Sequence, residues 1–144
     1  MVDIMPANIR NVTPNQLRPG TVVSVSFLGV FRHKGIVSDR CNAGKPMVIS
    51  NSPTAGCVTE EPWDTFAAGN EVTVEGYPSE FPSCTVVQRT REQIGSPYQL
   101  FNWNCEHLVS YAHGQSPTSP QVRTIVALSM ILGIIGMIRS NCKR

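Results

Sequence analysis

The stretch Phe101-Asn102-Trp103-Asn104-Cys105-Glu106-His107-Leu108-Val109 decides the fold, because it places a cysteine where a loop turns into a helix. Asn102 or Asn104 can cap this helix, which continues with apolar residues at helical spacing and stops at His113-Gly114. The first turn of a helix carries unpaired N–H groups and the positive end of the backbone dipole, and both favour a thiolate. Cys105 is therefore a candidate nucleophile, although the motif alone fits an ordinary buried thiol equally well.

A cysteine nucleophile needs a base, and the chain offers one far upstream in the sequence. His33 lies inside Phe31-Arg32-His33-Lys34-Gly35-Ile36-Val37, a short run that is typical of a strand. His107 is nearer to Cys105 in sequence, but two residues along a helix it points to nearly the opposite side. His33 is therefore the candidate base.

The motif Asn104-Cys105-Glu106-His107-Leu108-Val109 resembles the Asn-Cys-Glu-His-Phe-Val signature of the lecithin retinol acyltransferase (LRAT) family. That family belongs to the NlpC-type group of cysteine enzymes, which have a permuted papain-like fold. Residues 33–37 are similar to the histidine strand of the family, and residues 17–23 to the Pro-Gly stretch before it. Residues 60–66 also resemble bacterial members. The resemblance spans roughly residues 15–114 and implies that the histidine strand packs His33 against Cys105.

The family has a third polar site residue, commonly a second histidine, after a strand of the Val-Ile-His type. Here Val48-Ile49-Ser50-Asn51 puts Ser50 at that position, with Asn51 next. Neighbouring strand residues face opposite sides, so only one of the two can point at His33, and the register favours Ser50. Either side chain can orient an imidazole, the serine more weakly, and a backbone carbonyl or a water is the alternative.

The sequence predicts an α+β protein: a permuted papain-like (NlpC/LRAT-type) antiparallel sheet packed against the cysteine helix, plus a C-terminal hydrophobic helix. Strands are expected at residues 21–28, 30–38, 47–51, 57–60 and 71–77, and helices at 62–68, 82–94 and from Cys105 onward. The expected organisation is an irregular segment at 1–14, one catalytic domain at 15–114, a linker at 115–122 and a hydrophobic helix with basic ends at 123–144.

Composition narrows the range of functions. A net charge of +2 over 144 residues is too small to indicate nucleic acid as a partner. The five cysteines show no zinc-site spacing, and we expect neither a metal nor a cofactor. The odd cysteine count and the absence of a signal-like start favour a reducing, cytoplasmic location.

Residues 124–138 form an uncharged apolar segment with arginines on both flanks. As a helix it would be about 22 Å long, shorter than the roughly 30 Å core of a bilayer. Because many animal members of the family carry a C-terminal hydrophobic anchor, the resemblance favours a transmembrane or membrane-anchoring helix. The alternative is a helix that closes over the sheet or joins a dimer.

The chemistry that the resemblance implies is acyl transfer or hydrolysis on lipid esters, of the phospholipase A/acyltransferase type, through a Cys105 thioester with His33 as base. Backbone N–H groups at the helix start would stabilise the oxyanion. One alternative is a cysteine amidase or peptidase of the NlpC type. Another is a non-catalytic interaction module, which the missing second histidine keeps open.

Overall fold

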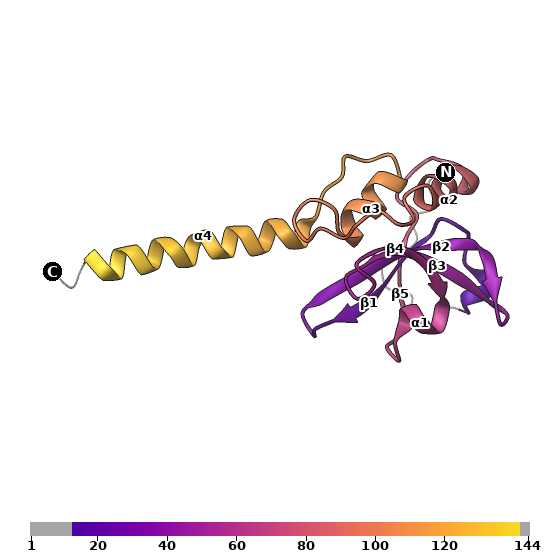
Figure 1. The fold of residues 1–144 in the computed structure, drawn as a ribbon, viewed down its shortest axis with the longest axis horizontal. Helices are drawn as coiled ribbons and strands as arrows, with labels where there is room; N and C mark the ends of the chain where they lie inside the picture. The colour runs from indigo at the N-terminus through magenta and orange to yellow at the C-terminus, as the bar shows by residue number, and fades with distance from the viewer. Residues whose placement is uncertain (1–12, 142–144) are drawn as a thin grey trace.

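The computed structural model describes residues 13–141 and contains one five-stranded antiparallel sheet with helices against it (Figure 1). The strands β1 (Val22–Phe27), β2 (Phe31–Asn42), β3 (Lys45–Ser52), β4 (Cys57–Pro62) and β5 (Thr73–Gly76) lie in the order β4-β3-β2-β1-β5. The helices are the short 3-10 helix η1 (Pro14–Gln16), α1 (Trp63–Ala67), α2 (Ser83–Arg91), α3 (Cys105–Ala112) and α4 (Pro120–Asn141). The predicted α+β class with an antiparallel sheet is confirmed. Most of the irregular segment expected at 1–14 lies outside the described residues, as does Cys142.

Successive side chains of a strand point to opposite faces of the sheet, so the core has two layers, one on each face. Val23 and Val25 of β1 face α1, where they pack with Trp63 and Phe66. Val22, one residue earlier, faces the opposite side of the sheet. Because the side-chain period of a strand is two, a slip of one residue would exchange these two sets between the layers and disrupt the packing of both.

The second layer lies between the sheet and the helices α2 and α3. Val22 and Ile36 pack there with Val86 of α2 and Val109 of α3. Leu108 of α3 is fully buried against two further strand residues, Ile49 of β3 and Val58 of β4. This packing holds the start of α3, and with it Cys105, close to the middle strands.

The first half of β2 has a strand neighbour on one side only. It pairs with β1 from Phe31 to Ile36, whereas its pairing with β3 starts at Ile36 and is interrupted between Val37 and Cys41. Gly35 stands where β2 and β3 begin to separate. A Cβ on this glycine would lie 2.5 Å from Val48 Cγ1 and 3.0 Å from Phe66 Cε2, so only glycine lets the layers approach this closely. The backbone edge of β2 before Gly35 is therefore open to other parts of the chain.

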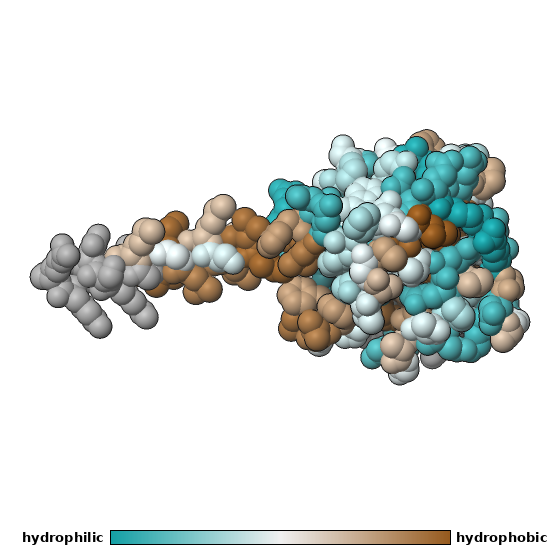
Figure 2. Space-filling view, in the orientation of Figure 1, coloured by the Kyte–Doolittle hydropathy of each residue, from teal (hydrophilic) through white to brown (hydrophobic). Residues whose placement is uncertain are grey.

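Helix α4 leaves the sheet and the other helices and extends away from them (Figure 1). Apolar side chains cover much of the part of α4 that is coloured in Figure 2, and Leu128, Leu132 and Met137 are 56%, 69% and 71% exposed. Helix α4 therefore does not close over the sheet, which was one of the two expectations for this segment. Because α4 begins at Pro120, the expected linker at 115–122 ends inside it.

Among the helices of residues 13–141, none combines the length and the apolar character that crossing a bilayer requires. The predicted transmembrane helix is therefore not confirmed.

Candidate active site

Cys105 is the first residue of α3, and Asn104 is its N-cap. The Asn104 side-chain oxygen accepts hydrogen bonds from the backbone N–H groups of Glu106 at 2.9 Å and His107 at 3.3 Å. Its amide nitrogen donates to the carbonyl of Leu100 at 2.9 Å. Asn104 rather than Asn102 therefore caps the helix, and its hydrogen bonds to residues before and after it fix the orientation of the loop that carries Cys105.

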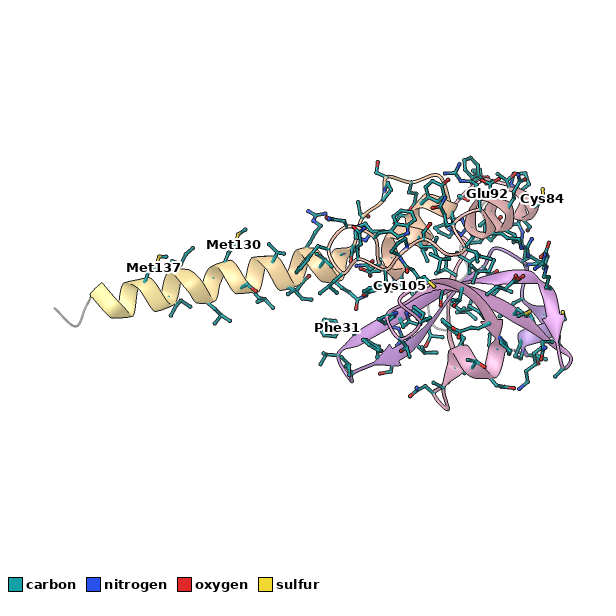
Figure 3. All side chains as sticks on the ribbon, in the orientation of Figure 1. Phe31, Cys84, Glu92, Cys105, Met130 and Met137 are labelled. Atoms are coloured by element: carbon teal, nitrogen blue, oxygen red, sulfur yellow. The ribbon has the colours of Figure 1, made fainter. Side chains whose placement is uncertain are left out.

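The Cys105 side chain is buried between the start of α3 and the strands (Figure 3), with 8% of the residue exposed. Burial raises the pKa of the thiol. The backbone N–H and the charge of Lys34 oppose this effect, while the Glu106 carboxylate adds to it. The helix start therefore does not bring the pKa of this thiol below its ordinary value, because burial outweighs the groups that favour the thiolate. Cys105 is a thiol at neutral pH, so a base must remove its proton during attack.

His33 lies on β2, with its ring centroid 5.4 Å from that of Phe66 and 6.5 Å from that of Phe27. Burial among these rings lowers the pKa of the imidazole to about 4. His33 is therefore neutral at pH 7 and has a lone pair with which to accept a proton.

His33 and Cys105 come from elements far apart in sequence and line the same cavity, which has a volume of about 280 Å³. Within residues 13–141 no hydrogen bond joins the thiol to the imidazole, and the nearest acceptor of the thiol is the carbonyl oxygen of Arg32 at 4.0 Å. The structure thus brings the two predicted residues into one cavity, and their catalytic roles stay predictions.

Ser50 and Asn51 point to opposite faces of β3. The Oγ of Ser50 lies 3.2 Å from Nε2 of His33. The amide of Asn51 instead donates to the carbonyl of Trp103 at 2.7 Å, which fixes the loop before Cys105. Of the two candidates for the orienting residue, Ser50 is the one in contact with the imidazole.

Glu61 is a site residue that the sequence analysis did not single out. Its carboxylate lies 3.4 Å from the Ser50 Oγ, and burial raises its pKa, while the hydrogen bond from Ser50 lowers it. In the register of β3 and β4, Glu61 is opposite Val48 and Thr59 is opposite Ser50, so the contact between Glu61 and Ser50 is diagonal. Only the cross-strand register could have revealed this contact.

The walls of the shared cavity are mostly apolar and come from three parts of the chain. The β1–β2 hairpin contributes Phe27, Leu28 and Phe31. The loop before α3 contributes Tyr98 and Leu100, and the first turns of α4 contribute Val122 and Ile125. Figure 3 labels Phe31 at the end of the sheet from which α4 leaves. The start of α4 is therefore part of the cavity.

A polar network holds this first turn of α4 in place. The side-chain oxygen of Gln121 accepts from the Arg32 backbone N–H at 3.0 Å, and its amide donates to the Arg32 carbonyl at 3.1 Å. The buried Glu106 carboxylate accepts from the Ser119 hydroxyl and from the Gln121 backbone N–H at 3.1 Å. Gln121 thus occupies the open edge of β2 beside His33, a role that the sequence pattern of a linker does not suggest.

His107 contributes to the cap rather than to the cavity. Its Nδ1 accepts a hydrogen bond from the backbone N–H of Asn104 at 3.3 Å, which completes a capping box. Cys41, Cys57, Cys84 and Cys105 form no disulfide. Over the described residues, no group of histidine, cysteine, aspartate and glutamate side chains is arranged to hold a metal ion.

A family model described as lecithin retinol acyltransferase matches residues 15–116. The resemblance in the sequence to this family is thereby confirmed. A search among curated proteins found no match. The matched stretch includes Cys105, His33 and Ser50, and it ends before α4 begins.

Proposed function

The chain belongs to the lecithin retinol acyltransferase family, and we propose that it is a thiol enzyme that transfers or hydrolyses the acyl groups of lipid esters. One observation carries the proposal: a buried thiol at a helix start and a neutral imidazole line one cavity with apolar walls. The ester carbonyl would sit at Cys105, and its acyl chain would lie against the apolar side chains that α4 and the hairpin contribute.

In the first half-reaction, His33 removes the proton from the Cys105 thiol, and the sulfur attacks the ester carbonyl carbon. Because Nε2 of His33 faces Ser50, Nδ1 is the nitrogen that accepts this proton. The carbon–oxygen bond of the ester then breaks, and the imidazolium returns the proton to the departing alcohol. A thioester on Cys105 remains.

In the second half-reaction, His33 deprotonates the incoming nucleophile, which attacks the thioester carbonyl. Water gives a free fatty acid, and a hydroxyl or amine acceptor gives a transferred acyl group. In both cases the carbon–sulfur bond breaks, and the proton returns to the thiolate of Cys105.

The oxyanion needs hydrogen-bond donors close to the sulfur. Two N–H groups of the first turn of α3, those of Glu106 and His107, donate to the Asn104 side chain. The remaining candidate of that turn is the N–H of Cys105 itself. Of the N–H groups at the helix start that were expected to stabilise the oxyanion, we therefore propose only that of Cys105.

Exposed apolar side chains around the cavity support a lipid substrate. Leu28 at the hairpin tip is 77% exposed and Leu100 in the loop before α3 is 50% exposed, although both also line the cavity. Helix α4 extends this apolar surface. We propose that the protein works on the cytoplasmic side of a membrane, where its unpaired thiols stay reduced and its substrate enters from the lipid phase.

The test is the intact mass of the protein after incubation with phosphatidylcholine vesicles. We expect an acyl adduct on the wild type and on Cys84→Ala, which removes an exposed thiol, and no adduct on Cys105→Ala. An adduct formed only with peptide or amide substrates would instead support the NlpC-type amidase. Absence of an adduct with either class of substrate would support a non-catalytic module.

A further inference from the structure

The Ser50 hydroxyl lies between a base and an acid. Ser50 is completely buried, and its Oγ is 3.2 Å from Nε2 of His33 and 3.4 Å from Oε1 of Glu61. Across residues 13–141 these are the two hydrogen-bond partners of the hydroxyl. The three side chains stand on three adjacent strands, β2, β3 and β4, in that order.

The direction of these two hydrogen bonds follows from the number of protons present. A serine hydroxyl has one proton to donate, and an ionised carboxylate can only accept. When Ser50 donates to Glu61, its lone pairs are left to accept from His33, so Nε2 must carry the imidazole proton. Nδ1 is then unprotonated and can act as the base.

We propose that Glu61 is a positioning residue, which acts through the Ser50 hydroxyl to hold His33 in the tautomer that has Nδ1 free to accept the Cys105 proton. The assignment rests on the proposed thiol chemistry, in which His33 is the base. In this chain, Ser50 and Glu61 would together take the role of the second histidine that the family commonly has. In triads of this kind, the third group fixes the tautomer and orientation of the imidazole.

Glu61→Gln is the informative substitution, because it keeps the shape of the side chain and adds an amide donor. The glutamine amide can donate to the Ser50 oxygen, which frees the hydroxyl proton to point at His33. Nε2 would then accept, the ring proton would move to Nδ1, and the base facing Cys105 would be lost.

The experiment measures the tautomer of His33 by ¹⁵N NMR of the histidine rings in the full chain, with His33→Gln used to assign the signal. We expect the Nε2–H tautomer in the wild type and a shift towards the Nδ1–H tautomer in Glu61→Gln. The rate of alkylation of Cys105 by iodoacetamide at pH 7 should fall at least about tenfold in the same variant. In a Ser50→Ala background, Glu61→Gln should change neither quantity further, because the connection to His33 is already absent.

Glu60→Gln is the matched control, since Glu60 is the neighbouring residue on β4 and pairs with Arg40 at 3.0 Å and Arg91 at 3.3 Å. It should lower the melting temperature without changing the His33 tautomer. An Nδ1–H tautomer in the wild type would overturn the proposal. So would an unchanged tautomer in folded Glu61→Gln and in folded Glu61→Met, which lacks any oxygen acceptor for the Ser50 hydroxyl. A tautomer change in a protein that forms no acyl adduct supports the Glu61 assignment and counts only against lipid-ester chemistry.

Discussion

Helices α3 and α4 are both rich in apolar side chains, but their surroundings differ completely. Leu108 of α3 is fully buried against two strands, while Leu132 of α4 is 69% exposed. Burial of a leucine side chain contributes roughly 1.5–3 kcal/mol to folding, and this contribution is absent where the side chain stays in water. The apolar residues of α3 therefore stabilise the fold, whereas most of those of α4 remain exposed.

The largest expected effect tests this difference directly with one substitution in each helix. Leu108→Ala should lower the free energy of unfolding by about 2–5 kcal/mol, because it leaves a cavity between α3 and the sheet. Leu132→Ala should change it by less than about 0.5 kcal/mol, because no described contact depends on it. Urea unfolding of the two variants measures both values. Comparable losses in both would mean that α4 packs on the folded domain.

The next effect is the acid dependence of stability, which we assign to His33, within the part of the chain that the family model matches. The pKa of His33 is about 4 in the folded chain, whereas the unfolded chain has the ordinary histidine value of 6.5. Between these values the unfolded chain binds more protons, so stability is complete above pH 6.5 and falls as the pH drops towards 4. We expect a loss of roughly 2 kcal/mol between pH 7 and pH 5. Unfolding curves of the wild type and His33→Gln at both pH values measure it, and an identical loss in the variant would exclude His33 as the cause.

The junction of the two regions is tested by Gln121→Ala. The substitution removes two hydrogen bonds to the Arg32 backbone, at 3.0 Å and 3.1 Å. We expect a loss of about 1 kcal/mol in stability and a lower rate of Cys105 acylation, because the cavity wall loosens. Thr124→Ala, on the exposed side of the same helix, is the control and should preserve acylation. Unchanged acylation in Gln121→Ala would show that the hydrogen bonds between Gln121 and Arg32 do not support the site.

The smallest effect on stability is expected from deleting α4 after Val126, which keeps Gln121, Val122 and Ile125 in the cavity wall. The free energy of unfolding should change by less than about 0.5 kcal/mol, so the melting temperature should change little. Acylation from vesicles should fall, while acylation from a dispersed short-chain ester should be preserved. A truncated chain that aggregates or melts much earlier would contradict the view that α4 serves an external surface.

Much of the fold was predictable because its signals are local. Alternating apolar residues such as Val23 and Val25 mark a strand, and Cys105 with Leu108 and Ala112 marks a helix. Strand bounds were predicted less well: β2 continues to Asn42 through an irregular pairing with β3 that the sequence pattern does not indicate, whereas β5 covers only Thr73–Gly76. Helix α2 is shorter than predicted and ends at Arg91 rather than Ile94.

The sequence by itself determined the α+β class, the family resemblance and the positions of Cys105 and His33, because these depend on patterns among neighbouring residues. Tertiary structure decided that Ser50 rather than Asn51 contacts His33, that Glu61 lies behind Ser50, and that Gln121 covers the open edge of β2. It also decided that Cys105 is a thiol, since burial raises its pKa. Cross-strand register and burial are set by residues distant in sequence, so neither contact partners nor proton affinities can be obtained from a local motif.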